Sequence, residues 1–214
     1  RAALLALTIG IGVACGGDGA AGEATRVVAS PAASTPAATP TALIKAARML
    51  PVTPVSIDYL VADPAFEALP GARALFGEYE GGGYQIEVPE NWNGDVVYFA
   101  HGFRGNPPQL TVGPPPLRDY LIAQGYAWAA SSYTRNGYEP GAGARDTLAL
   151  QPVFERLVGA PRYSYLYGQS MGGHVVTLSL EQFPQAYDGA LSECGVVSGH
   201  ENLDYFVSWG ALAS

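Results

Sequence analysis

The stretch that decides the fold runs from Tyr163 to Phe183 and reads YSYLYGQSMGGHVVTLSLEQF. Its first part, Tyr163–Tyr167, is rich in aromatic residues, as a short strand is. Its last part, Met171–Phe183, is a longer apolar segment that stops at Pro184, which is typical of a helix. Residues 168–172 between them read GQSMG, a G-x-S-x-G pattern at a strand-to-helix junction.

This pattern predicts that Ser170 is a nucleophile. At such a junction a sharp turn strains the serine backbone and leaves its hydroxyl exposed above the sheet. We expect Gly168 and Gly172 to lack side chains because the strand and the helix crowd the turn. The N-terminus of the helix favours the negative charge that develops in acyl transfer. The alternative is a plain glycine-rich turn.

Strands and helices alternate along the rest of the domain. We expect strands at Tyr84–Val88, Asp95–Ala100, Tyr126–Ser132 and Tyr187–Val197, and helices at Leu117–Gln124, Arg145–Val158 and in the tail. Such alternation predicts an α/β fold, in which helices cover both faces of a mostly parallel sheet.

A second glycine loop follows the predicted strand Asp95–Ala100, where residues 101–105 read HGFRG. With the phrases YFAHGFRG, YGQSMGGH and YDGALSECGV, the chain resembles the α/β-hydrolase superfamily, in particular exported bacterial serine esterases and prolyl-peptidase-like hydrolases. The resemblance implies an oxyanion hole in which Phe103 and Met171 supply backbone N–H groups, supported by Gly102. We expect His101 to hold its loop by hydrogen bonds and not to act as the base.

The acid and the base of a catalytic triad are harder to place. In α/β hydrolases the chain order is Ser, then Asp or Glu, then His. His174 lies one helical turn after Ser170, where a packed or hydrogen-bonded role is favoured. His200 follows the serine by 30 residues, whereas the family places its histidine after further strands. The carboxylates available after Ser170 are Asp188, Glu193 and Asp204.

We therefore expect the chain to be the N-terminal part of a longer protein. The acid, the base and the last strands of the sheet would lie beyond Ser214, and the isolated chain would lack turnover. Near the pocket we expect Arg104, Tyr133 and Trp128, since they lie at or near strand ends, where open α/β sheets bind ligands. Cys194 is expected to be a small buried residue.

The N-terminal residues have the pattern of an export signal followed by a spacer. Ala2–Ala14 is an uncharged apolar run, too short to span a bilayer. It ends before Cys15 in small residues that resemble a bacterial lipobox, in which this cysteine would be lipidated; an ordinary signal peptide is the alternative. Residues 16–54, rich in Ala, Thr and Pro, form an extended linker, and residues 55–214 the hydrolase domain. The location implied is extracytoplasmic, either membrane-anchored or secreted.

Charge and composition exclude several classes of function. The chain has 19 acidic and 11 basic residues and a net charge of −8, which disfavours binding to nucleic acid. Two cysteines and three histidines show no metal-ligand spacing. Gly141-Ala142-Gly143 lacks the third glycine of a dinucleotide fingerprint. We expect no metal and no cofactor.

The sequence thus predicts an exported serine hydrolase that cleaves carboxylic esters through an acyl-enzyme on Ser170. Its expected partners are a small-molecule ester or amide substrate and, through a lipid on Cys15, a membrane. One alternative is a serine peptidase of the prolyl-oligopeptidase type. Another is a non-catalytic binding lipoprotein that retains the fold.

Overall fold

The computed structural model describes residues 57–198 and 200–213, all within one compact unit, Pro54–Ser214. The predicted export segment 1–15, with Cys15, and the predicted linker 16–54 lie outside the described residues. Among the described residues, no helix combines the length and the apolar character that crossing a bilayer requires.

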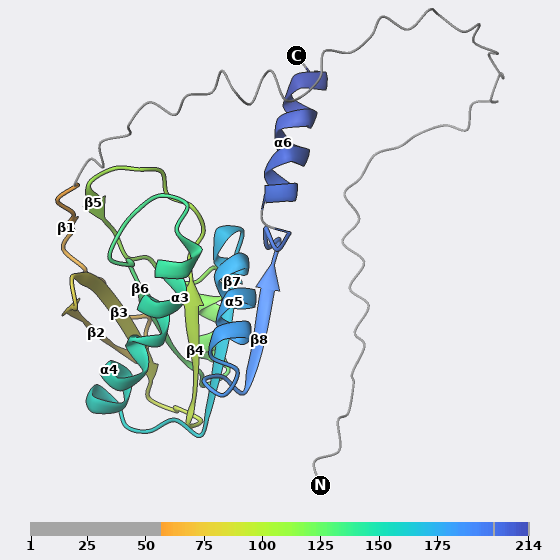
Figure 1. The fold of residues 1–214 in the computed structure, drawn as a ribbon. Helices are drawn as coiled ribbons and strands as arrows, with labels where there is room; N and C mark the ends of the chain where they lie inside the picture. Colours follow the sequence, from red (N-terminus) through yellow and green to blue (C-terminus); the bar gives the residue numbers. More distant parts are fainter. Residues whose placement is uncertain (1–56, 199, 214) are drawn as a thin grey trace, which may run out of the picture. The chain divides into compact units, whose positions relative to one another are not determined.

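A six-stranded sheet forms the centre of the domain (Figure 1). Its strands, in spatial order, are β2 (Ala72–Tyr79), β3 (Gly82–Pro89), β6 (Ala127–Ser131), β4 (Asp95–Ala100), β7 (Tyr163–Gln169) and β8 (Gly189–Glu193). β6, β4, β7 and β8 are parallel, whereas β2 and β3 form an antiparallel hairpin at one edge. Two short strands, β1 (Leu60–Val61) and β5 (Gln109–Leu110), pair separately. The predicted α/β class with a mostly parallel sheet is confirmed.

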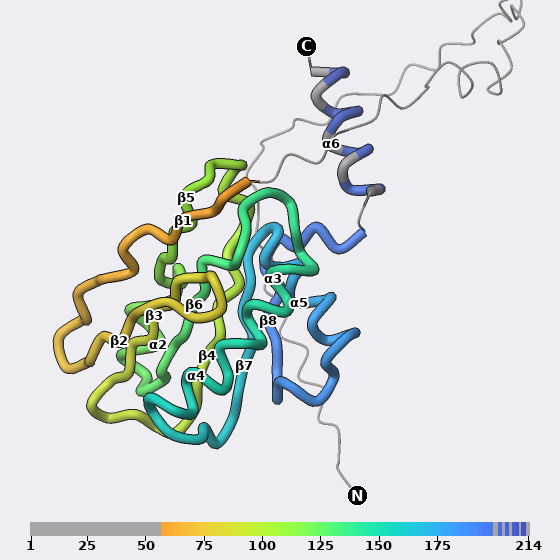
Figure 2. The backbone as a smooth tube through the Cα atoms, turned by 60° about the vertical axis from the view of Figure 1, so that its left-hand side comes forward, coloured from red at the N-terminus to blue at the C-terminus, as the bar shows by residue number. Residues whose placement is uncertain are grey.

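Helices cover both faces of this sheet, as Figures 1 and 2 show. On one face α2 (Arg118–Ala123) packs against Val97 and Phe99 of β4. On the other face α3 (Pro140–Leu148), α4 (Leu150–Leu157) and α5 (Met171–Gln182) share a core with Val96 and Tyr98. Alternate residues of β4 thus serve opposite cores, because successive side chains of a strand point to opposite faces. The last helix, α6 (His200–Ala213), follows β8.

The prediction of one helix over Arg145–Val158 is wrong, because the segment belongs to two helices, α3 and α4. Pro152 explains the division. A proline has no backbone N–H, and its ring clashes with the carbonyl four residues earlier in a continuous helix, which here belongs to Leu148, the last residue of α3. The start of α3 at Pro140 also fits the preference for proline in a first helical turn.

Other boundaries differ from the predictions. β8 covers only Gly189–Glu193 of the predicted Tyr187–Val197, and three strands, β1, β2 and β5, were not predicted. β2 is an edge strand that pairs only with β3, and its residues are mostly half-buried or exposed. Such a strand carries a weaker apolar signal than a central one.

Trp128 was expected near the pocket, and this prediction is wrong because the side chain binds a buried carboxylate instead. It is the second residue of β6, is fully buried, and donates from Nε1 to Glu87 Oε2 over 2.7 Å. Glu87 also binds Arg118 Nε and the Leu69 backbone N–H, at 2.7 and 2.6 Å. The tryptophan therefore belongs to a structural network that joins β3, β6 and α2.

The register of two central strands positions the site. β4 and β7 are parallel neighbours, and Ala100 at the end of β4 lies opposite Gly168 near the end of β7. The residues that follow these two strands, His101 and Ser170, therefore emerge at the same edge of the sheet. Open α/β sheets bind ligands at this carboxyl edge.

Candidate active site at Ser170

Ser170 occupies the turn between β7 and α5 with a strained backbone. Its φ is 58° and its ψ is −119°, a conformation that costs an L-residue about 1–3 kcal/mol. Its N–H donates to the Glu193 carbonyl oxygen, and its carbonyl oxygen accepts from the Gly173 N–H, both over 2.9 Å. A strained serine held between a strand and a helix is the geometry of a nucleophile elbow.

The two glycines of the motif lie where no side chain fits. A Cβ on Gly168 would overlap the carbonyl oxygen of Gly172, and a Cβ on Gly172 would overlap that of Ala100. The turn is thus packed backbone against backbone, on one side by α5 and on the other by the end of β4. Glycine is required at both positions because any side chain would push these elements apart.

The loop after β4 lies directly against the serine. A Cβ on Gly102 would lie 3.1 Å from the Gln169 carbonyl oxygen and 3.9 Å from Ser170 Oγ. The backbone N–H groups of Phe103 and Met171, the predicted oxyanion donors, have no protein acceptor within residues 57–198 and 200–213. Both are therefore available to a ligand atom.

His101 supports this loop and faces backbone carbonyls. Its Nδ1 lies 2.7 Å from the Gly102 carbonyl oxygen and its Nε2 3.3 Å from that of Ser132. Burial lowers the pKa of His101 to about 4, and the nearby Arg104 guanidinium adds to this effect, so the ring is neutral at pH 7. A neutral ring has one N–H group and donates to one of these two carbonyl oxygens, which fits the predicted loop-holding role.

Tyr133 lies behind the loop rather than near the pocket as predicted. Its ring is buried and stacks on His101, with centroids 3.9 Å apart, and its hydroxyl donates to the His101 carbonyl oxygen over 3.1 Å. Its φ is 59°. The Ser131 hydroxyl accepts from its N–H, and the Ser132 hydroxyl donates to its carbonyl oxygen. Burial raises the pKa of this phenol, which keeps it a neutral donor.

A hollow of about 380 Å³ opens beside Ser170. Arg104, expected near the pocket, does line it. The sequence analysis missed three apolar lining residues: Phe99, Pro114 and Pro116. The prolines indicated only a helix boundary, and Phe99 only a buried strand. A signal was present for Phe99, because it lies at the end of the strand that precedes the glycine loop and therefore at the same edge of the sheet as Ser170. The sequence held no such signal for the two prolines.

The described histidines do not contact the serine hydroxyl. His174, on α5, has Nδ1 3.0 Å from the Tyr138 hydroxyl, in keeping with the expected hydrogen-bonded role. His200 is the first residue of α6, and its side chain lies outside the described residues. Within the part of the chain that the structure describes, no hydrogen bond joins Ser170 Oγ to a histidine.

The candidate acids occupy three different places. Asp188 precedes β8 at the opposite edge of the sheet, where Oδ2 accepts from the Ser164 N–H over 2.8 Å. Glu193 ends β8 beside the elbow, and Oε2 accepts from the Tyr167 hydroxyl over 2.5 Å. Asp204 is an exposed residue of α6. Glu193 is thus the carboxylate that the fold brings to the serine's edge of the sheet.

Cys194 is exposed, so its predicted burial is wrong. It directly follows β8, with a φ of 49°. Among the described residues, no cluster of His, Cys, Asp and Glu could hold a metal ion.

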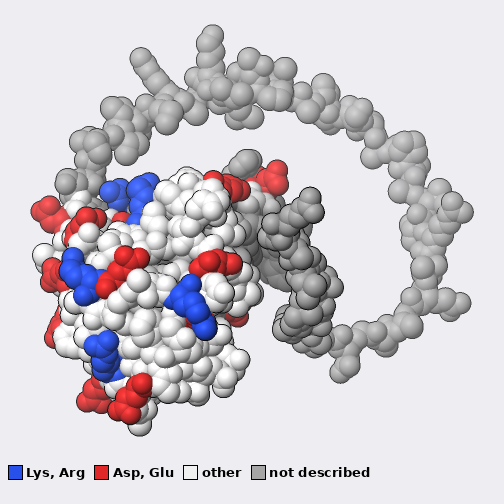
Figure 3. Space-filling view, turned by 90° about the horizontal axis from the view of Figure 1, so that it is seen from below, with Lys and Arg blue, Asp and Glu red and all other residues white. Residues whose placement is uncertain are grey.

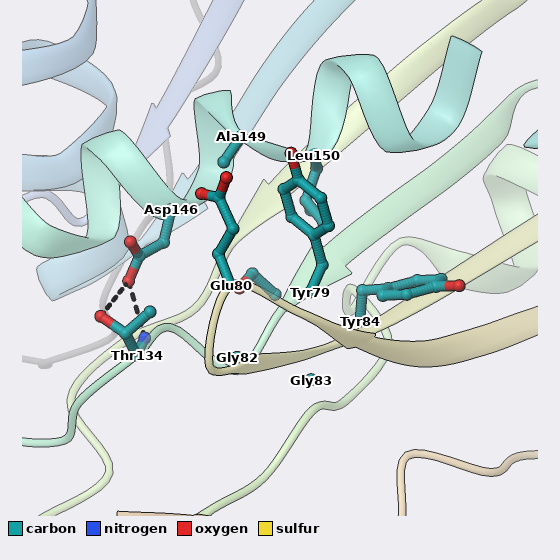
Figure 4. Close-up of a pocket in the computed structure, with 10 residues that line it drawn as sticks. Tyr79, Glu80, Gly82, Gly83, Tyr84, Thr134, Asp146, Ala149 and Leu150 are labelled. Atoms are coloured by element: carbon teal, nitrogen blue, oxygen red, sulfur yellow. Dashed lines mark hydrogen bonds between the residues drawn. The ribbon is translucent and has the colours of Figure 1, made fainter. Parts of the chain in front are cut away.

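A second hollow lies between the β2–β3 hairpin and helices α3 and α4 (Figure 4). Asp146 accepts there from the Thr134 N–H and hydroxyl, at 2.7 and 2.9 Å. This second hollow has a volume of about 20 Å³, which is enough for one water molecule. None of the predicted site residues lines it.

Comparison with known proteins gives limited similarity. No family model matches the chain. The o-phthalyl amidase of Xanthobacter agilis is 27% identical over 117 residues, which are 53% of this chain and 25% of that protein. The match thus spans about a quarter of the length of that relative.

Solved structures with some similarity include hydrolases of two kinds. A putative dipeptidyl aminopeptidase IV of Bacteroides ovatus has 14% identity and a TM-score of 0.46, over 58% of this chain and 21% of that one. Brefeldin A esterase, a bacterial homologue of human hormone sensitive lipase, has 16% identity and a TM-score of 0.45, over 62% and 44%. An esterase of Aspergillus oryzae has 18% identity and a TM-score of 0.41, over 58% and 27%.

The fold type is defined by the chain's own geometry. A mostly parallel sheet has helices on both faces, and a strained serine stands between a central strand and the helix that follows. A glycine loop from the neighbouring strand lies against that serine. The chain therefore has a fold of the α/β-hydrolase type.

Proposed function

We propose that the protein is a serine hydrolase that cleaves carboxylic esters through an acyl-enzyme on Ser170. The observation that carries this proposal is the strained backbone of Ser170 between two glycines that tolerate no side chain. A protein retains about 1–3 kcal/mol of such strain where it serves a function. Here the strain directs a hydroxyl toward a hollow at the carboxyl edge of the sheet.

In this mechanism Ser170 Oγ attacks the substrate carbonyl carbon and gives up its proton to a base. The N–H groups of Phe103 and Met171 hold the oxyanion, and each such donor is worth about 3 kcal/mol of transition-state stabilisation. Collapse breaks the bond to the leaving oxygen, which takes the proton from the base and departs as the alcohol, and water then hydrolyses the acyl-enzyme. We assign the base to a histidine other than His101 and His174, because both are engaged elsewhere.

The experiment supplies imidazole as an external base and asks which residue becomes acylated. With p-nitrophenyl acetate we expect one acetyl group on Ser170, located by peptide mass spectrometry. Ser170→Ala should lose this modification, whereas Ser198→Ala, which alters an exposed serine on the segment after β8, should retain it. Acetylation that persists in Ser170→Ala, or that never reaches Ser170 in the folded wild type, contradicts the proposal and favours the non-catalytic binding protein.

Amide cleavage is the second candidate, and the similarity to an amidase favours it. Esters and amides react through the same acyl-enzyme but differ in the leaving group. A comparison of p-nitrophenyl acetate with a prolyl p-nitroanilide separates an esterase from a peptidase. We further propose an extracytoplasmic location, which the apolar segment before Cys15 supports.

A further inference from the structure

An arginine beside Ser170 has no carboxylate partner. Arg104 directly follows Phe103 and lines the same hollow as Ser170. Its Nη1 donates to the Thr111 carbonyl oxygen and lies 3.4 Å from Thr111 Oγ1. Within residues 57–198 and 200–213, the ion pairs involve other arginines. The Nε and Nη2 groups of Arg104 are therefore left for another acceptor.

The environment of this side chain disfavours an unpaired charge. Arg104 is partly buried, and burial lowers its pKa. The positive charge of Arg104 also helps to lower the pKa of the buried His101. Solvent therefore does not fully screen this charge from the interior. Withdrawing a cation from water costs free energy unless an anion or hydrogen-bond acceptors compensate. The carbonyl and hydroxyl oxygens of Thr111, both reached from Nη1, compensate only in part.

The rest of the hollow suits a small organic anion. Its walls include the apolar side chains of Phe99, Phe103, Pro114 and Pro116, and its volume is about 380 Å³. Polar groups of Arg104, Gln169 and Ser170 line it as well, and sites for small molecules combine apolar contacts with polar groups that fix orientation. A guanidinium presents planar, paired donors that match a carboxylate.

We propose that Arg104 binds a carboxylate of the substrate, so that the site selects esters or amides carrying a carboxylate near the reacting carbonyl. The inference rests on the proposed function of Ser170, and Arg104 takes no part in bond making. It is a specificity-determining residue, placed by the loop that also carries the Phe103 N–H.

The test measures binding in the Ser170→Ala protein, so that it does not depend on the chemistry of Ser170. Benzoate and benzamide have the same shape and differ in charge, and titration calorimetry gives both affinities. We expect benzoate to bind more tightly than benzamide. Arg104→Gln should weaken benzoate binding by roughly tenfold or more, the value of a charged hydrogen bond, with little effect on benzamide. Arg104→Lys should be intermediate.

Arg73→Gln is the matched control, because it removes the same charge from an exposed position on β2. It should leave benzoate binding unchanged. Equal binding of benzoate and benzamide to the Ser170→Ala protein that retains Arg104 overturns the inference by itself. So does a folded Arg104→Gln protein with undiminished benzoate affinity, or a loss that Arg73→Gln reproduces.

Two isomeric amides show which side of the scissile bond carries the carboxylate. N-phenylmalonamate has it in the acyl part and N-benzoylglycine in the amine part. If Arg104→Gln weakens the binding of one of these two amides, the inference is supported, and that amide shows which side of the scissile bond carries the carboxylate. If it weakens the binding of neither, the inference is overturned. Acetylation of Ser170 without Arg104-dependent binding would contradict this inference alone. Benzoate binding without acetylation would contradict the proposed function alone.

Discussion

At the amino ends of the parallel strands the charges are paired, whereas at the carboxyl ends the backbone is strained and a charge is left unpaired. Glu87 pairs in register with the second residue of β6 and binds Arg118. Asp95 is the first residue of β4 and binds Arg162 through two hydrogen bonds of 2.9 Å. Figure 3 views the molecule from this side and shows basic side chains next to acidic ones.

Strain gathers at the opposite ends of the strands. The described non-glycine residues with positive φ are Glu80, Tyr133, Ser170 and Cys194. Three of them directly follow or nearly follow the ends of β6, β7 and β8, and Glu80 lies in the β2–β3 turn at the same edge. Strained residues cluster where a site needs groups in fixed positions. The amino ends therefore hold the paired charges, and the carboxyl ends hold the strained residues and the candidate site.

Two arginines make the contrast concrete. The hydrogen bond from Arg118 to the Glu87 carboxylate raises the pKa of Arg118, whereas burial without a carboxylate partner lowers that of Arg104. The first arginine is part of the folded structure's own network. The second has no carboxylate partner among the described residues, and it is the one that we propose binds a substrate carboxylate.

The largest expected effect tests the paired end. Glu87→Ala should lower the free energy of unfolding by about 4 kcal/mol, because Arg118, Trp128 and the Leu69 N–H each lose their bond to this carboxylate and Arg118 is left without its ion-pair partner. Urea denaturation measures this change. Glu90→Ala, which removes an exposed carboxylate after β3, should change stability by about 0.5 kcal/mol at most. Equal effects of the two substitutions would contradict a structural role for Glu87.

The next effect concerns His101 and pH. Its pKa is about 4 in the folded protein and about 6.5 when unfolded, so the unfolded state binds a proton first as the pH falls. The stability that neutral His101 contributes is complete above pH 6.5 and decreases by about 3 kcal/mol between pH 6.5 and pH 4. The difference in unfolding free energy between wild type and His101→Gln across this range isolates the effect. A difference that does not change with pH would refute the prediction.

A smaller effect tests the strained end. Ser170→Gly removes the Cβ that makes a φ of 58° unfavourable, at the cost of a more flexible unfolded chain. It should be more stable than Ser170→Ala by about 1 kcal/mol, since alanine retains the Cβ. Thermal unfolding of the two variants measures the difference. If alanine proves as stable as glycine, the turn is not under the strain that its dihedral angles indicate.

The smallest effect is expected at the unpaired arginine. Arg104→Gln should change the free energy of unfolding by about 0.5 kcal/mol or less, because relief from burying a charge offsets the lost bond to Thr111. Arg118→Gln, by comparison, leaves the buried Glu87 carboxylate without its ion-pair partner and should lower the free energy of unfolding several times more. Denaturation of both proteins in one buffer makes this comparison. A large loss in Arg104→Gln would show that this arginine is structural.

The central part of the fold could be predicted because local sequence and tertiary environment agree there. Asp95–Ala100 is predicted and observed with identical bounds, since a strand buried on both faces is a nearly continuous apolar run, here broken only by Asp95 at its start. The division of α3 from α4 was missed although Pro152 marks it. The edge strand β2 was missed because its half-exposed face dilutes the apolar pattern.

For the site, the sequence by itself determined the elbow, since Gly168, Ser170 and Gly172 meet a requirement of one turn and its immediate neighbours. It also placed Gly102 in the next loop along the same sheet edge. Only the tertiary structure decided that Tyr133 supports His101 from behind, that Trp128 binds Glu87 and that Arg104 faces the hollow beside Ser170. These roles depend on contacts between residues far apart in the chain, and no local pattern encodes which residue will be the neighbour.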